Sequence, residues 1–528
     1  MSSKPDIVVV GAGSNSLVAA AYLAKAGKNV LGLEKNTQCG GGVVSIEIAP
    51  GFINAPHASG YYLCIASPAI QHDELELQSK FGLEWKTWGA GFGTIFDSGE
   101  TLVAYTDLDR TCQDIAKFSN KDAEAYRAFV TECRAMYPLL SRGGSTPPLP
   151  TGAFLTLLES SARGRRLVDM MFASAYDIIT HLFESTELRI HMMKWVAEAM
   201  EGPEVKGTGA MLIGLFGLAH THDAHIPVGG SRAVTNSLLR CIEHHGGTIR
   251  TGCEVTRINI SGGRAKGVTL STGEVIDAAD AVLGCVHPWR LDQIIPEVDP
   301  DIAKAARAVK LSNHGALNQQ FALSEWPKFK FGTDALWDDV LCIEYVRKDE
   351  LAVRKVFDQY KYGEIPTHLS PLTMMDSRKD PSRAPSADHC ALYLYHFAPR
   401  NLVDGGLEGW NQHRQDFADA IWEEFISYTT NIDASKVIAR HIESPLEHHH
   451  HSASMVEGDI FGIGTTMGQN MGRRPIPELA QFRIPGIDSL YLVGPFMHPG
   501  GTVNFGGRAT AMRMMMDWKM DLNRSFVL

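Results

Sequence analysis

The chain has 528 residues, 44% of them hydrophobic and 21% charged, which is a globular composition with enough length for the cores of two to four domains. Its 49 basic and 60 acidic side chains give a net charge of −11 without any long basic run, which argues against nucleic-acid binding. Nine cysteines without a C-x-x-C motif are typical of a reducing, cytoplasmic setting. A predicted strand begins by residue 7 with no charged and then apolar leader, so we expect no secretory signal.

The first predicted elements form a β–α–β unit around two glycines. Residues 7–10 (IVVV) are a β-branched run typical of a buried strand, and residues 15–26 are rich in helix formers. Gly11 and Gly13 lie between them, where glycine permits a tight turn and a close ligand. The start of the helix has unpaired N–H groups and a partial positive charge, which suit a pyrophosphate. Ser16 replaces the third glycine of the G-x-G-x-x-G pattern and is small enough for close helix–strand packing.

An acid completes this unit. Glu34 ends a second predicted strand, 21 residues after Gly13, where a carboxylate is expected to accept hydrogen bonds from ribose hydroxyls. Its negative charge argues against a 2′-phosphate at this site. Because this is the one complete fingerprint in the sequence, we expect one tightly bound dinucleotide; the alternative is an ordinary β–α–β unit with no nucleotide.

Later stretches extend the pattern. Residues 38–52 contain three consecutive glycines, which indicate a second close approach of backbone to ligand. Residues 226–286 predict a glycine turn, a helix and the strands of a small sheet. Residues 486–518 predict a buried strand, a glycine-rich turn and a methionine-rich helix. Because the sheet resumes after about 150 intervening residues, we expect an inserted domain.

These pieces resemble a known family. The segments that carry the resemblance are GAGSNSLVAAAYLAKAG, LEKN, GGG and PGF, then VGG and GTIRTGCEV, and finally LYLVGPFMHPGGTVNFGGRAT. They occur in the same order as in the phytoene desaturase and carotenoid isomerase-like FAD oxidoreductases, which the chain resembles. These are two-dinucleotide-binding-domain flavoproteins of the glutathione-reductase type. The likeness covers about a third of the chain, and it implies FAD as the cofactor.

The resemblance also implies which residues contact FAD. Gly11, Gly13 and Ser16 are expected at the pyrophosphate, Glu34 with its neighbour Lys35 at the adenosine ribose, and Val255 at the adenine. The remaining expected contacts, near the flavin, are Gly41, Gly42, Gly494, Gly501, Thr502 and Val503.

Two departures from the family pattern fall near the expected flavin position. Ala55 and His57 stand where relatives often have Asp and Gly, and Thr502 and Asn504 stand where they tend to have smaller residues. A lost carboxylate and a gained imidazole favour a functionalised substrate over a plain hydrocarbon. His57 and His498 are the candidate catalytic bases, and the alternative for each is a hydrogen-bonded structural histidine.

We therefore expect an α/β fold: a Rossmann-type FAD-binding domain from residues 1–70, 222–290 and 442–528, with an inserted mixed α+β substrate-binding domain from residues 71–221 and 291–441. The expected activity is desaturation, saturation or isomerisation at C–C bonds of a largely apolar, functionalised organic substrate. Two alternatives stand beside it. One is an amine- or alcohol-oxidising flavin oxidase that uses O₂, and the other is a non-catalytic module of the same fold that binds lipid groups.

Three further segments have an unusual composition: two are rich in histidine and one is entirely apolar. Residues 220–225 (HTHDAH) and 447–451 (EHHHH) have the histidine density of a metal site, but we favour a loop for the first and a polar surface turn for the second. We therefore assign no metal ligands, although a structural metal remains an alternative. Residues 209–219 (GAMLIGLFGLA) are too few to span a bilayer and favour a core helix or tunnel lining; the alternative is peripheral contact of this cytoplasmic chain with a membrane.

Overall fold

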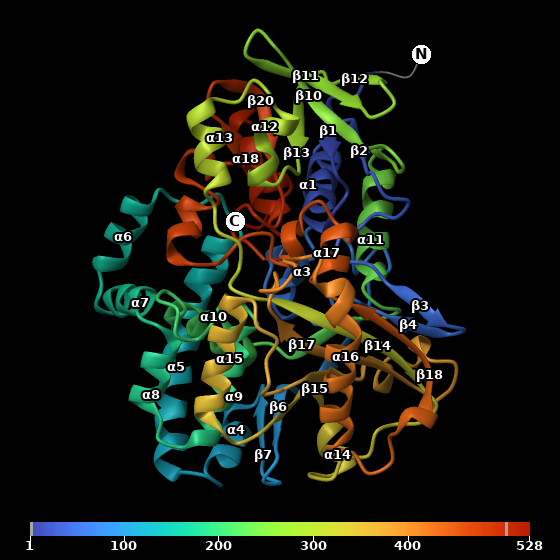
Figure 1. Cartoon of the computed structure of the whole chain (residues 1–528). Coiled ribbons are helices and arrows are strands. Elements are labelled where there is room, and N and C mark those ends of the chain that lie inside the picture. Colours follow the sequence, from blue (N-terminus) through green and yellow to red (C-terminus); the bar gives the residue numbers. More distant parts are fainter. Residues whose placement is uncertain (1–3, 502–504) are drawn as a thin grey trace.

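The computed structural model describes residues 4–501 and 505–528, and the chain folds around two large sheets (Figure 1). The first has the strand order β10-β11-β20-β13-β1-β2-β9, with β12 paired to β11 and β19 paired to β20. Its strands are β1 (Ile7–Val10), β2 (Val30–Leu33), β9 (Thr248–Arg250), β10 (Val255–Ser261), β11 (Arg264–Leu270), β12 (Val275–Asp277), β13 (Ala281–Gly284), β19 (Arg483–Ile484) and β20 (Ile487–Leu492).

The centre of this sheet is parallel. β1 pairs with β2 on one side and β13 on the other, β13 pairs with β20, and β2 pairs with β9. Strands distant in sequence therefore lie side by side, and their apolar side chains are buried on both faces, as parallel strands require. The helices α1 (Ser14–Lys25), α11 (Arg232–His244) and α18 (Gly507–Asp517) pack together beside it. The expected α/β fold with a Rossmann-type sheet is confirmed.

The second sheet is mixed and has the order β18-β14-β17-β16-β15-β6-β7. Its strands are β6 (Ala90–Phe96), β7 (Thr101–Tyr105), β14 (Gly315–Leu323), β15 (Val340–Val346), β16 (Leu372–Met374), β17 (Cys390–Ala398) and β18 (Val437–Glu443). Two antiparallel, two-stranded sheets complete the described strands: β3 (Ile46–Ala49) with β4 (Phe52–Asn54), and β5 (Trp85–Trp88) with β8 (Ala224–Pro227).

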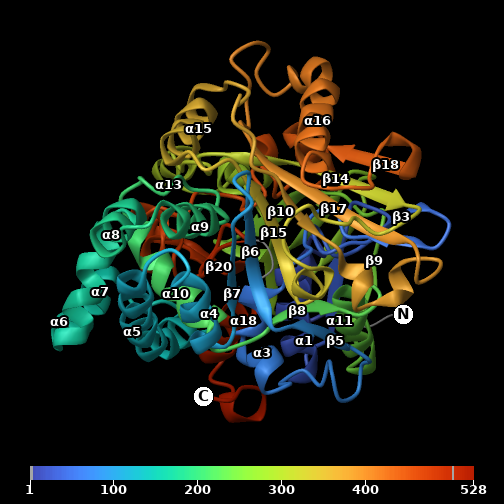
Figure 2. The same cartoon turned by 90° about the horizontal axis from the view of Figure 1, so that it is seen from below.

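Helices cover the second sheet, and Figure 2 shows α5 to α10 together on one flank of the molecule, away from β18. These are α5 (Asn120–Gly144), α6 (Thr151–Glu159), α7 (Ala162–Phe172), α8 (Ala175–Leu182), α9 (Thr186–Ala197) and α10 (Gly209–Ala219). The other helices are α2 (Tyr62–Ile65), α3 (Pro68–Gln71), α4 (Leu108–Ile115), α12 (Leu291–Ile294), α13 (Pro300–Arg307), α14 (Asp334–Trp337), α15 (Glu350–Tyr362), α16 (Trp410–Ile426) and α17 (Pro445–His451).

The apolar segment 209–219 is the helix α10. It packs against α5 so closely that a Cβ on Gly217 would lie 2.8 Å from Cβ of Tyr137, and Leu212, Ile213 and Phe216 are completely buried. This agrees with the interpretation of a core helix. Across the described residues, no helix is both long and apolar enough to cross a membrane.

Candidate cofactor and active site

Two glycine segments meet at the carboxyl end of β1. Gly11 has a φ of +82° and donates its N–H to the carbonyl of Leu33, while Gly13 is the N-cap of α1. The backbone of Gly40 pairs with that of Gly13, and a Cβ on Gly40 would lie 2.4 Å from the carbonyl oxygen of Val43. Only a residue without a side chain fits here, so the glycines keep bare backbone at the edge of the sheet.

The acid at the end of β2 is held by this turn. Glu34 Oε2 accepts a hydrogen bond of 2.8 Å from the Ala12 N–H, and Oε1 accepts one of 3.0 Å from the Asn36 N–H. The side chain is largely buried. Each carboxylate oxygen keeps a second lone pair, so Glu34 is oriented by the backbone and can still accept from a ligand hydroxyl.

A cleft opens over these groups and holds about 1210 Å³ of space, its open mouth included. Nine of the residues predicted from the sequence line it: Gly11, Gly13, Ser16, Glu34, Lys35, Gly41, Gly42, Val255 and Gly494. Gly501 is not one of the described residues that line the cleft. Thr502 and Val503 lie outside the described residues.

The cleft also contains residues that the sequence reasoning missed. Cys285, His287 and Arg290 enter from the segment after β13, and residues 452–455 enter from the segment after α17. The only feature of the sequence that could have indicated these residues is their position, because each follows a strand or helix that ends at the edge of the cleft.

The donors and charges of the cleft fit FAD. α1 begins here without a side-chain cap and without an acid in its first turn, so its positive end is left for an anionic group. This positive end matches a pyrophosphate, and the oriented Glu34 carboxylate matches the hydroxyls of a ribose.

A family comparison then decides the class. Residues 6–312, more than half of the chain, match the family described as DAO, FAD dependent oxidoreductase. The chain belongs to this FAD-dependent oxidoreductase family. The cofactor and the enzyme class that the sequence predicted are thereby confirmed, and desaturases among the relatives confirm the likeness to the phytoene desaturases.

Relatives of this FAD-dependent oxidoreductase match it over nearly its whole length. Mouse pyridine nucleotide-disulfide oxidoreductase domain-containing protein 2 is 28% identical, with 97% of this chain and 94% of the relative covered. A limonene dehydrogenase polypeptide of Castellaniella defragrans is 23% identical (96% and 94% covered), and lycopene-forming phytoene desaturase of Pseudescherichia vulneris is 24% identical (97% and 99% covered). Among solved structures, putrescine oxidase bound to putrescine shares the fold, with a TM-score of 0.57 at 13% identity (98% and 99% covered).

His57 and His498, the candidate bases, are not among the described residues that line the cleft, although His57 lies directly behind Gly42 of the lining. His498 Nε2 lies 2.9 Å from the carbonyl oxygen of Gly143, and burial lowers the pKa of His498 to about 4. His57 follows β4, and burial lowers its pKa to about 3 even though Glu443 acts in the opposite direction. Both imidazoles are neutral near pH 7, and a role as base stays a prediction for each.

The histidine-rich segments are arranged differently from the sequence expectation. Residues 447–451 are not a surface turn but the end of α17, whose start is fixed by a capping box between Ser444 and Glu447. His448 is completely buried and lies close to His57. In the other segment, His220 is buried at the end of α10 and lies 2.9 Å from the Tyr126 hydroxyl, while residues 224–227 form β8. Sequence reasoning thus missed a buried group consisting of His57, Glu443 and His448, named the His–Glu–His cluster below.

Proposed function

We propose that this FAD-dependent oxidoreductase dehydrogenates a C–C bond of a largely apolar, functionalised organic substrate. The observation that carries the proposal is the nearly full-length match to a limonene dehydrogenase polypeptide and to a phytoene desaturase, whose names describe dehydrogenation or desaturation of hydrocarbons. The match includes the second sheet as well as the cofactor cleft. Saturation and isomerisation are related outcomes of the same chemistry.

The second sheet carries a buried cluster of apolar and aromatic side chains. Tyr393 and Tyr395 of β17 stack with ring centroids 5.9 Å apart, and both rings belong to the same buried cluster as Phe397, Leu372 and Met374. The segment after β4 lies against this sheet, because a Cβ on Gly60 would be 3.8 Å from Met374 Cε. This segment continues from the residues at the cleft, so an apolar substrate against the sheet would be close to the cofactor.

Polar groups within this apolar region support a functionalised substrate. Glu198 and Glu344 lie near Lys194, and burial raises the pKa of Glu198 to about 8 and that of Glu344 to about 7. Neither carboxyl oxygen of Glu344 has a hydrogen-bond partner among the residues that the structure describes. A hydroxyl, carbonyl or amine on the substrate would supply a partner that the protein itself does not.

The chain and the cofactor have separate tasks in the proposed reaction. When bound, FAD supplies the two-electron acceptor. The glycine turn and Glu34 hold it in place, and the apolar residues around β17 position the substrate and exclude water. Because burial favours the protonated form of these carboxyl groups near neutral pH, they can donate a hydrogen bond to an oxygen of the substrate.

Anaerobic mixing tests the proposal. The FAD-loaded enzyme is mixed with terpenoid and carotenoid alkenes or alcohols in one series and with putrescine and cyclohexylamine in another, and bleaching of the visible flavin absorption band is followed. We expect bleaching with members of the first series and a product that has lost two hydrogen atoms by mass spectrometry. Bleaching by amines alone, with hydrogen peroxide formed on admission of air, would contradict it and favour an amine oxidase.

A further inference from the structure

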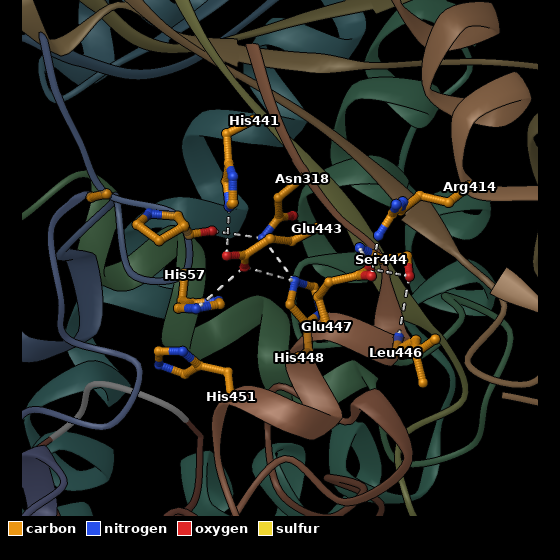
Figure 3. A network of polar contacts seen from close by, with 12 residues as sticks. His57, Asn318, Arg414, His441, Glu443, Ser444, Leu446, Glu447, His448 and His451 are labelled. Carbon is orange, nitrogen blue, oxygen red and sulfur yellow. Dashed lines mark hydrogen bonds and ion pairs between the residues drawn. The ribbon is translucent and has the colours of Figure 1, made fainter. Parts of the chain in front are cut away.

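The His–Glu–His cluster brings together three side chains from separate elements (Figure 3). His57 comes from the segment after β4, Glu443 is the last residue of β18, and His448 is in the middle of α17. The three point toward one another next to Asn318 of β14, which also contributes its amide. Figure 3 shows His441 on one side of Glu443 and His451 on the other side of His57.

The ligand atoms of the cluster lie close together. His57 Nε2 is 3.3 Å from Glu443 Oε2, and His448 Nε2 is 3.8 Å from the same oxygen. One ligand atom from each of the three residues lies within 4.8 Å of the other two. Bonds of about 2.0–2.2 Å to one metal ion place tetrahedral ligands about 3.3–3.6 Å apart, so two of these separations are close to the required values and the third needs a modest closing movement.

Protein partners satisfy these buried groups only in part. The side chain of His57 is 2% exposed and that of His448 is 0% exposed. Among the described residues, Nε2 of His57 and Oε2 of Glu443 are buried without a hydrogen bond, and Nε2 of His448 has one long contact, with the Asn318 amide. Buried polar groups are almost always hydrogen-bonded or bound to a metal, so these converging atoms indicate a missing ligand.

We propose that His57, Glu443 and His448 bind one divalent first-row transition ion, either zinc or ferrous iron. Two imidazoles and one carboxylate are the donor set of catalytic zinc sites and of non-haem iron sites, and this set leaves coordination positions open. Calcium and magnesium prefer sites made of oxygen ligands alone, so they do not suit it.

The surrounding residues provide the supporting contacts that metal ligands usually have. His441 Nε2 lies 2.9 Å from Glu443 Oε1, which leaves Oε2 directed toward the two cluster histidines. Asn318 donates from its amide nitrogen to the Pro56 carbonyl at 2.7 Å and so anchors the backbone next to His57. The same nitrogen lies 3.3 Å from His448 Nε2, a long contact that metal binding at Nε2 would replace.

The site would lie beside the cofactor cleft. His451, on the same helix as His448, has its Nε2 2.9 Å from the carbonyl oxygen of Gly41. A Cβ on Gly42 would lie 3.6 Å from His57 Cβ, and both glycines line the cleft. A divalent ion here would place positive charge next to the cofactor and could accept a polar group of the substrate in an open position.

The experiment measures metal in the FAD-loaded protein without using activity. Protein with any purification tag removed is dialysed against a chelator and then titrated with Zn²⁺ or, anaerobically, Fe²⁺, with metal counted by plasma mass spectrometry. Protein as purified is analysed in the same way and shows which of the two ions is taken up in the cell. The variants are His448→Gln and Glu443→Gln, and His450→Gln is the matched control because His450 is an exposed residue of the same helix.

We expect about one ion per chain in the wild type and in His450→Gln, and binding at least roughly 100-fold weaker in the other two variants at unchanged FAD content. Wild-type protein that retains no ion after titration, or His450→Gln losing as much affinity as His448→Gln, would overturn the proposal. Because a change at a buried ligand can also disturb folding, Co²⁺ titration of the wild type is a second measurement. Intense visible bands of a four- or five-coordinate site support the proposal, and their absence contradicts it.

Discussion

Among the buried ion pairs of the described residues, two lie beside different large sheets and are satisfied very differently. Arg508, in α18, donates two hydrogen bonds of 2.7 Å to Glu74, which also accepts from the Tyr22 hydroxyl and from the N–H of Val527. Beside the second sheet, Lys194 Nζ is 3.8 Å from Glu344, whose two carboxyl oxygens have no hydrogen bond to any described residue.

The difference separates a structural ion pair, Arg508–Glu74, from an incompletely hydrogen-bonded one, Lys194–Glu344, which is called the poised pair below. The Arg508 pair ties α18 to α1 and to the end of the chain, and its charges have the partners that burial demands. The Lys194 pair leaves Glu344 close to its titration point, with a pKa of about 7. Incompletely satisfied charges are costly, and proteins keep them chiefly at functional sites, which supports the proposal that the substrate binds against the second sheet.

The largest effect should come from breaking the satisfied pair. Arg508→Met leaves the Glu74 carboxylate buried without its main partner, so we expect a loss of about 3–5 kcal/mol in unfolding free energy by urea denaturation of the FAD-loaded protein. Arg513→Met is the control, since this residue of the same helix pairs with Asp517 near the surface, and its loss should cost about 1 kcal/mol or less. Equal costs for the two variants would remove the distinction.

The cofactor cleft should be nearly as sensitive to one charge. Glu34→Arg replaces an acceptor that two backbone N–H groups hold in place, and its guanidinium would face the same N–H groups. We expect FAD to bind at least roughly 100-fold more weakly, equivalent to about 3 kcal/mol, by fluorescence titration of the apoprotein. Glu84→Arg, at an exposed position, is the control for charge reversal. Full FAD retention by Glu34→Arg would make the ribose assignment wrong.

The pH dependence of the unfolding free energy should reveal the buried acids whose pKa is raised. Burial raises the pKa of Glu198 from 4.5 to about 8, so the folded protein holds a proton that the unfolded chain releases above pH 4.5. This contribution is present at low pH and is lost as the pH rises to about 8. Glu198→Gln should match the wild type at about pH 4 and be at least roughly 2 kcal/mol more stable at about pH 9, because each unit of the raised pKa corresponds to about 1.4 kcal/mol. A pH-independent difference in urea denaturation would contradict the shift.

The smallest effect should come from breaking the poised pair. Lys194→Met should cost about 1–3 kcal/mol at about pH 8 and less at about pH 5.5, because Glu344 then takes up a proton and is no longer a buried charge. Urea denaturation at the two pH values measures this. A loss at the lower pH as large as that of Arg508→Met would show that the two pairs are equivalent after all.

Local sequence is enough to predict the cofactor side of the molecule. The turn at Gly11 and Gly13 and the acid at Glu34 are close in sequence, and each is required by the backbone of a single β–α–β unit. The parallel sheet follows from three apolar runs of strand length. Such features depend on neighbouring residues, so spacing and residue type are sufficient to find them.

The His–Glu–His cluster depends on long-range packing and cannot be found in this way. His57 and Glu443 meet only because β18 pairs with β14 while Asn318 of β14 holds the backbone at Pro56. The prediction of a surface turn for the histidine run is wrong because it rests on histidine density and leaves out Ser444 and Glu447. Serine followed three residues later by glutamate is a helix-start signal, and it indicates that His448 belongs to a helix.

The strand order of the first sheet also has a consequence for how the chain is made. β13 has β1 on one side, but its other neighbour, β20, is synthesised about 200 residues later. At roughly 5–20 residues per second, a ribosome needs about 10–40 seconds to cover that interval. Throughout that time the apolar edge of β13 lacks its native partner and is a template for aggregation. Cells that produce this enzyme well should therefore depend on chaperones during translation, and a chain stopped before residue 487 should be recovered as aggregate.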